Sequence, residues 1–178
     1  MKLTICTSES QLASLERLYL EAFPASERKP FPLLLAKSQE GFVELLALEG
    51  EDHTFLGLAI TVLHQDMALL DYFAVVPGMR GQNKGSAALC LLKDRYRDKK
   101  LILEIEDPEE ESENKEERLR RKAFYIRNNM VVMPCSLELF GIKMLLLTSG
   151  HMVSFEEYHK IYEAAFPGII AENIKKLP

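Results

Sequence analysis

One stretch of the chain, residues 69–92 (LLDYFAVVPGMRGQNKGSAALCLL), constrains the fold more than any other. It begins with a mostly apolar, aromatic and β-branched run, which is typical of a buried strand. Pro77 and Gly78 end that strand, because proline cannot donate to a ladder and both residues favour turns. Gly81 and Gly85 then stand at the start of a helical segment. This order aims several backbone N–H groups and the positive end of the helix dipole at one spot, which predicts an anion site.

The length and composition indicate an ordinary globular protein. A chain of 178 residues is most simply one domain, residues 1–178, that buries enough surface to fold without disulfides or a metal. Hydrophobic residues make up 47% of the chain, but no apolar run is long enough to span a membrane. The first residues do not read as a signal peptide. We therefore expect a cytoplasmic protein with no membrane partner.

The sequence has no motif typical of a disulfide framework or a metal site, and no net positive charge. Cys6, Cys90 and Cys135 form no C-x-x-C motif, and the four histidines form no H-x-x-x-H pair. We therefore expect neither a disulfide framework nor a metal site. The net charge of -5 means that the chain lacks the excess of positive charge typical of proteins that bind nucleic acids, so we expect no such partner.

Before this stretch the patterns predict two helices and two strands. Residues 11–23 have helical spacing with Ser8 or Ser10 as the cap, and a shorter helix follows at 33–38. We interpret the charged connector 27–30 as a solvated loop, although such a connector can also line a substrate entrance. Strands are expected at 41–48 and 54–64. With the strand at 69–76 they form an antiparallel meander, because parallel neighbours need a long crossover.

After this stretch the chain changes to a crossover and then a hairpin. A helix at 84–97 and a strand at 101–106 make a strand–helix–strand unit with parallel strands. The strand LILEIE has one buried face, and Ile102, Glu104 and Glu106 lie on the other. The basic helix that follows is expected to be solvated and self-paired.

The last third of the chain is expected to form a hairpin, a helix and a tail. Residues 130–137 and 139–147 predict an antiparallel hairpin, and residues 155–166 a helix capped by Ser154 with Glu157 at the capping-box spacing. A polar tail ends at Pro178. The fold class expected is α+β, with a central mixed, mostly antiparallel sheet flanked by helices.

Two segments resemble the GNAT superfamily of acetyl-CoA-dependent N-acetyltransferases. FAVVP followed by RGQNKGS is similar to the family's strand ending in Ala-Val-x-Pro and its R/Q-x-x-G-x-G/A turn. RKAFYIRNNM is similar to the family's A-x-x-F-Y segment, with Asn128 or Asn129 where glycine is usual. The resemblance covers about residues 55–147 well and the N-terminal helices loosely.

The resemblance implies a binding site for acetyl-CoA. It implies that three residues pair with the pantetheine arm like an added strand, namely Phe73, Ala74 and Val75. It also implies that the backbone of the turn holds the pyrophosphate, namely at Arg80, Gly81, Gln82, Asn83, Lys84, Gly85 and Ser86. The sequence departs from the family pattern at two of these positions. Asparagine replaces the middle glycine but tolerates a left-handed backbone, and lysine replaces an apolar residue, either facing solvent or adding charge near the phosphates.

Acetyl transfer to an amine needs a base, because an ammonium with a pKa near ~10.4 is about three units from being a nucleophile at pH 7. Glu104 matches the glutamate that some members use as this base, and Glu106 and Asp71 are alternatives. Glu104 could equally be an exposed or salt-bridged carboxylate of the strand without a catalytic role. The family implies that the Val75 N–H stabilises the oxyanion. It also implies that Tyr125 protonates the leaving thiolate, although a tyrosine on an apolar helix face is also a core residue.

We therefore expect an enzyme that moves acetyl from acetyl-CoA to an amine of a small molecule or peptide by direct attack in a ternary complex. The three carboxylates favour a cationic acceptor. The alternatives are a module of the same fold that binds acyl-CoA or senses a metabolite without turnover, and a protein-interaction domain. The resemblance also allows a homodimer through the closing strands.

Overall fold

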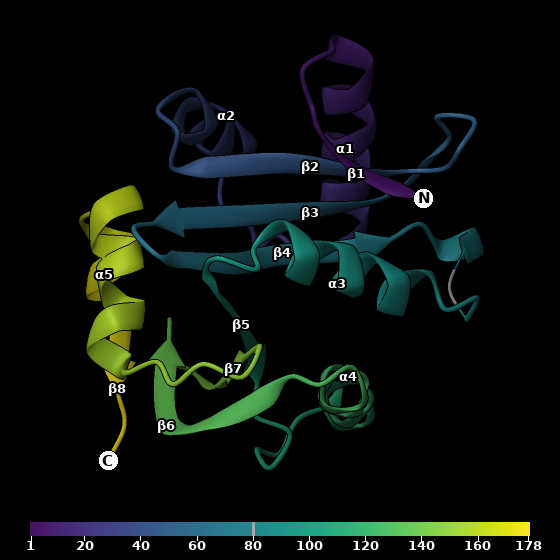
Figure 1. The fold of residues 1–178 in the computed structure, drawn as a ribbon. Coiled ribbons are helices and arrows are strands. Elements are labelled where there is room, and N and C mark those ends of the chain that lie inside the picture. Colours follow the sequence, from purple (N-terminus) through teal and green to yellow (C-terminus); the bar gives the residue numbers. More distant parts are fainter. Residues whose placement is uncertain (80) are drawn as a thin grey trace. The chain divides into compact units, whose positions relative to one another are not determined.

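The computed structural model describes residues 1–79 and 81–178, shown as a ribbon in Figure 1. The described residues group into two compact units. The first contains Met1–Leu63 and Leu70–Arg95, and the second contains His64–Leu69 and Tyr96–Pro178. The boundary therefore passes through the hairpin between the third and fourth strands. Among the described residues, no helix combines the length and apolar character needed to cross a bilayer.

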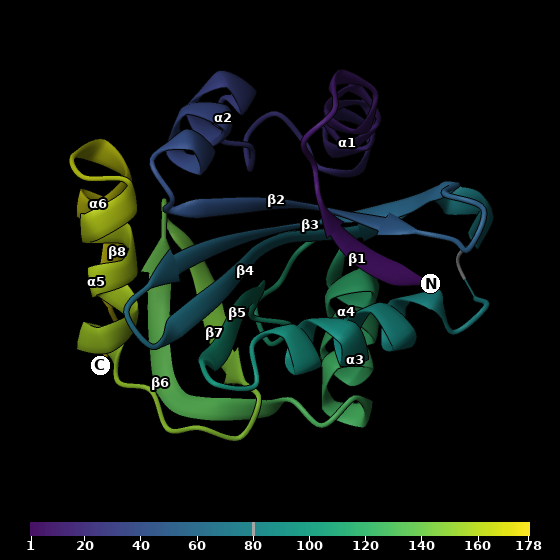
Figure 2. The same cartoon turned by 45° about the horizontal axis from the view of Figure 1, so that its top comes forward.

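The first unit is a set of antiparallel strands with helices on both sides. Its elements are β1 (Lys2–Ile5), α1 (Glu9–Ala22), α2 (Phe31–Gln39), β2 (Val43–Glu49), β3 (Phe55–His64), β4 (Met67–Val75), a short 3-10 helix (Pro77–Met79) and α3 (Lys84–Arg95), with β3 and β4 crossing the boundary at one end. The strand order is β1-β2-β3-β4, and β2 pairs antiparallel with both β1 and β3. Figure 2 shows α1 and α2 on one side of these strands and α3 on the other. The antiparallel pairing predicted for the strands before residue 69 is confirmed, whereas β1 was not predicted.

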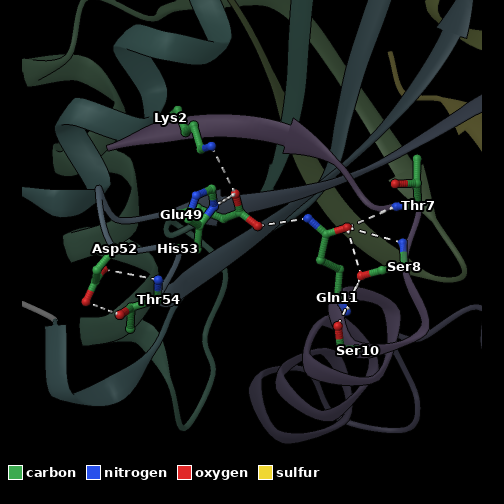
Figure 3. A network of polar contacts seen from close by, with 9 residues as sticks. All are labelled: Lys2, Thr7, Ser8, Ser10, Gln11, Glu49, Asp52, His53 and Thr54. Atoms are coloured by element: carbon green, nitrogen blue, oxygen red, sulfur yellow. Dashed lines mark hydrogen bonds and ion pairs between the residues drawn. The ribbon is translucent and has the colours of Figure 1, made fainter.

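A buried carboxylate ties the start of α1 to the end of β2 (Figure 3). Glu49 is 5% exposed and accepts a hydrogen bond of 2.8 Å from Gln11 Nε2. This hydrogen bond holds the pKa of Glu49 below its usual value. Gln11 also completes a capping box with Ser8, so Ser8 rather than Ser10 caps the predicted helix. One glutamine thus serves both the helix cap and the carboxylate.

The second unit is a four-stranded antiparallel arrangement with three helices among the described residues. Its elements are β5 (Lys100–Glu106), α4 (Lys115–Arg127), β6 (Val131–Leu139), β7 (Ile142–Thr148), α5 (Phe155–Ala165), α6 (Ile169–Glu172) and β8 (Ile174–Lys176). The strand order is β5-β7-β6-β8, and each neighbouring pair is antiparallel. The predicted β6–β7 hairpin is confirmed, with its turn at Phe140 and Gly141. Their φ angles of 48° and 82° are those of the left-handed turns that match strand twist.

The end of the chain differs from its prediction as a polar tail. Residues 174–176 form β8, which pairs with β6, so this segment is an edge strand. Helix α5 begins as predicted, with the reciprocal capping box of Ser154 and Glu157. Strand β6 has a register shift between Val132 and Ser136, around Pro134, which cannot donate to the ladder. Figure 2 shows the bend of β6.

Strand β5 is covered on both faces, which corrects the prediction of one buried face. Ile102 is 0% exposed and Glu106 is 8% exposed, although both lie on the face assigned to carboxylates. Partners from distant parts of the chain cover that face, and alternation along a strand does not reveal them.

Candidate active site

The turn after β4 has the backbone geometry expected of a phosphate-binding turn. After the 3-10 helix, Gly81 and Asn83 both adopt left-handed conformations, with φ angles of 76° and 56°. The side chain of Gln82 donates a hydrogen bond of 3.2 Å to the Gly78 carbonyl and braces the loop. Asn83 therefore turns as the expected glycine would, as its tolerance of positive φ predicts. Arg80 lies outside the described residues.

Helix α3 begins directly after this turn. The amide of Ala87 donates a hydrogen bond of 3.0 Å to the Asn83 carbonyl, and the amides of residues 84–86 precede this first helical bond. Gly81, Gln82 and Asn83 are exposed, and a Cβ built on Gly81 would meet no atom of the described residues, its chain neighbours aside, within 4 Å. The turn therefore leaves room for an anion beside donor groups that the helix does not use.

Strand β4 approaches its neighbour β3 very closely at Gly57. A Cβ on Gly57 would lie 2.4 Å from the Ala74 carbonyl oxygen and 3.1 Å from the Val75 Cα, so only glycine fits. The amide of Val76 donates a hydrogen bond of 2.9 Å to Leu56 on β3. Because successive amides along a strand point to opposite sides, the Val75 N–H points away from β3. The half-buried segment Phe73 to Val75 thus keeps a donor directed away from that partner.

The connector between α1 and α2 is fastened to β4, which corrects its interpretation as a solvated loop. Lys29 Nζ lies 2.9 and 2.8 Å from the two carboxylate oxygens of Asp71. The Tyr72 hydroxyl donates to the Glu27 carbonyl at 2.9 Å and accepts from the Lys29 amide at 3.0 Å. The Tyr19 hydroxyl donates to the Lys29 carbonyl at 3.0 Å. Asp71 is therefore engaged by an internal cation, which argues against it as a base for an outside amine.

Glu106 is likewise paired within the second unit. Arg118 of α4 contacts one oxygen at 2.6 Å, and Arg121 contacts the other at 3.2 Å. The Arg118 side chain is 11% exposed, so this arginine belongs to a buried ion pair rather than to the solvated, self-paired helix predicted. Glu106 thus anchors α4 to β5. Asp71 and Glu106 are both paired with internal cations. Of the three carboxylates that were expected to favour a cationic acceptor, only Glu104 still supports that prediction.

Glu104 has a different environment, built from α5. The hydroxyls of Tyr158 and Tyr162 donate hydrogen bonds to its two oxygens, the second at 2.8 Å. Both tyrosines are fully buried, at 0% exposure, whereas Glu104 is only partly buried. The two phenol donors fix the orientation of the carboxylate. Sequence reasoning missed both tyrosines, although their four-residue spacing on the amphipathic helix α5 places them on one face.

Tyr125 of α4 is buried at 8% exposure. Burial raises the pKa of its phenol to about 12, while the charge of Arg121 acts in the opposite direction. Among the described residues, none forms a hydrogen bond with the Tyr125 hydroxyl. The phenol therefore stays protonated at neutral pH and keeps a proton to donate.

A buried thiol and two buried phenols predict that the folded protein loses stability at alkaline pH. Burial raises the pKa values of Cys6, Tyr19 and Tyr125 to about 12, from ordinary values of 9.0 for the thiol and 10.0 for the phenols. Their folded-state pKa values lie above the unfolded ones, so their contribution to stability is complete below pH 9 and declines as the pH rises to about 12.

We expect the free energy of unfolding, measured in urea, to fall across this range. Cys6→Ala should flatten the first part of the fall, because the thiol begins to titrate before the phenols. Equal slopes in the variant and the parent below pH 10 would contradict the role given to Cys6.

The predicted site residues thus fall into two groups. Those for the pantetheine arm and the pyrophosphate are contiguous in the first unit, at the end of β4, the turn and the start of α3. Glu104 and Tyr125 belong to the second unit. The described residues contain no cluster of three or more His, Cys, Asp or Glu side chains that could hold a metal ion.

No family model matches the chain, and no curated protein sequence matches it. Solved structures do. A protein from Bacteroides thetaiotaomicron assigned to the GNAT acetyltransferases superposes with a TM-score of 0.80 and 19% identity, over 94% of this chain and 99% of that one. The chain has the GNAT fold. The predicted fold class and the resemblance seen in the sequence are therefore confirmed at the level of the fold.

Two further structures with a similar fold are named as N-acetyltransferases. A chimeric spermidine N-acetyltransferase from Vibrio cholerae and hSSAT has a TM-score of 0.65 and 12% identity, over 83% of this chain and 95% of that one. An aminoglycoside 6'-N-acetyltransferase in complex with coenzyme A has a TM-score of 0.57 and 12% identity, over 86% of this chain and 100% of that one. At these identities the likeness concerns the fold alone.

Proposed function

We propose that the protein is an acetyl-CoA-dependent N-acetyltransferase, which moves an acetyl group to an amine of a small molecule or peptide by direct attack in a ternary complex. The observation that carries this proposal is the open left-handed turn at Gly81 and Asn83, directly before α3, in a chain with the GNAT fold. Such a turn provides the backbone donors that a pyrophosphate requires.

In this proposal the residues of the turn hold coenzyme A, and the segment Phe73 to Val75 aligns its pantetheine arm. Acetyl-CoA supplies an activated thioester. The Val75 N–H, which points away from β3, donates to the carbonyl oxygen as negative charge develops there. Tyr125, protonated at neutral pH, donates a proton to the departing thiolate.

Glu104 takes the role of the base that accepts a proton from the acceptor amine, directly or through water. At pH 7 an alkyl ammonium needs roughly 4 kcal/mol to reach its neutral form, so a fixed carboxylate that accepts the proton lowers the barrier. The hydrogen bonds from Tyr158 and Tyr162 orient the carboxylate for this role. Both oxygens of Glu104 accept hydrogen bonds from phenols, whereas Asp71 contacts a lysine and Glu106 contacts two arginines.

The same contacts favour a second candidate function. The two phenol donors already occupy one acceptor site on each oxygen of Glu104, which leaves fewer sites for an amine. A module that binds acyl-CoA without turnover needs the turn and β4 but not a strong base. Both functions require binding of coenzyme A, so only a measurement of turnover distinguishes the enzyme from the binding module.

The test separates these outcomes. Calorimetry with coenzyme A measures binding, and release of the free thiol from acetyl-CoA measures turnover over a panel of polyamines, aminoglycosides and peptide N-termini. The first two classes follow from what the structural neighbours acetylate. Binding with turnover supports the enzyme, binding without turnover supports the module, and no binding overturns both proposals.

Asn83→Gly is expected to tighten coenzyme A binding by no more than about fivefold, since asparagine already adopts the left-handed conformation and the remaining strain is at most about 1 kcal/mol. Asn83→Val is expected to weaken binding about tenfold or more, because a β-branched residue is strained there. Calorimetric affinities of the three proteins check both values. Equal affinities for asparagine and valine would show that the left-handed turn is not needed for binding.

A further inference from the structure

Helix α4 leaves an apolar stripe exposed to solvent. Leu119 is 47% exposed and Ile126 is 44% exposed, and the small residue Ala123 between them is exposed as well. Spacings of four and three residues place these side chains in one row along the helix. Tyr125 lies on the buried side, so the stripe is separate from the residue proposed to act in catalysis.

The exposed charges of α4 are divided along its length. The exposed acidic residues Glu116 and Glu117 precede the stripe, Arg120 and Arg121 lie within its length, and Arg127 follows it. Within the described residues, Glu116 and Arg120 have no ion-pair partner, despite their four-residue spacing. Arg127 lies over the ring of Phe124, at 5.2 Å from its centroid. The exposed side of α4 therefore begins with acidic side chains and ends with Arg127, and the apolar stripe between them is accompanied by Arg120.

We propose that α4 is a self-association surface, which pairs antiparallel with α4 of a second copy of this chain. A two-fold axis midway between residues 122 and 123 brings Leu119 of one copy level with Ile126 of the second copy. Ala123 lies beside the axis, where a small side chain lets two helices approach closely. The two identical surfaces are then complementary, as a two-fold contact requires.

The charges suit the same arrangement. Glu116 then lies within two residues of the level of Arg127 of the second copy, an offset of about 3 Å along the helix axis. The acidic end of each helix thus faces the basic end of the other. A parallel arrangement would place like charges together, and a polyanionic partner would meet the acidic end of the same face.

The contact should be weak. One pair of helices buries less than a standard interface, so we expect a dissociation constant between about 1 and 100 µM. Sedimentation velocity of the full chain, over concentrations on both sides of this range, measures the monomer–dimer equilibrium. A chain that remains monomeric at the highest concentration overturns the proposal.

Charge exchange provides the specific test. Glu116→Arg and Arg127→Glu are each expected to weaken the dimer at least about tenfold by facing like charges, and the double variant should restore it. Leu119→Lys should abolish dimerisation. Ile169→Lys, at a residue that is 73% exposed on α6, is the matched control and should leave it unchanged. Equal effects of Leu119→Lys and Ile169→Lys, or single charge reversals that change nothing, overturn the proposal. These outcomes do not depend on acetyl transfer.

Discussion

Tyr125→Phe is expected to lower kcat for acetyl transfer about 100-fold or more while leaving coenzyme A affinity within about twofold, because loss of a general acid typically reduces rates by two to four orders of magnitude. The phenol is buried and its pKa is raised to about 12, so only its protonated form contributes at neutral pH. The change removes one oxygen and preserves the ring. Steady-state kinetics and calorimetry on the same preparations check the two expectations.

The control for this variant is Tyr96→Phe, which removes a hydroxyl from another buried tyrosine, 4% exposed. It should change stability more than turnover. Full activity of Tyr125→Phe would remove this residue from the mechanism and leave it as part of the core. A loss of coenzyme A binding in step with the loss of kcat would instead indicate a structural role.

Gly57→Ala is expected to destabilise the fold by at least about 2 kcal/mol, as overpacking against backbone atoms does. The added methyl would lie 2.4 Å from the Ala74 carbonyl oxygen and 2.9 Å from Leu48 Cδ1. Relief requires β4 to move away from β3, which displaces the segment proposed to align the pantetheine arm. We therefore expect weaker coenzyme A binding together with a lower urea midpoint.

Gly78→Ala is the matched control, because a Cβ at Gly78 would meet no atom of the described residues, its chain neighbours aside, within 4 Å. It should change the free energy of unfolding by no more than about 0.5 kcal/mol. If both alanine variants unfold at the same urea concentration, the close approach of β3 and β4 does not contribute to stability. If Gly57→Ala destabilises without weakening coenzyme A binding, β4 does not position the ligand.

Most elements were predictable because their signals are local. Proline and glycine ended β4 at the expected place, and the capping box at Ser154 located the start of α5. The tolerance of Asn83 for positive φ predicted a turn that the structure contains. β1 and β8 were missed because strands of four and three residues are too short for alternation to be recognised.

The candidate site was predictable only in part. The turn and β4 are one continuous segment, so spacing alone located them. The surroundings of the carboxylates were not predictable, since alternation along β5 indicates a face but not what covers it. Glu104 proved to be bound by tyrosines and Glu106 by arginines, although the two residues share one face of one strand.

The sequence by itself determined the strand, turn and helix of residues 69–92, because backbone preferences and helix-terminal donors depend on neighbouring residues. Only the tertiary structure shows what each candidate carboxylate contacts. The contact of Lys29 with Asp71 joins residues 42 positions apart, and that of Tyr162 with Glu104 joins residues 58 apart. Such pairs leave no periodic signal in the chain, since they form only when packing brings separate elements together.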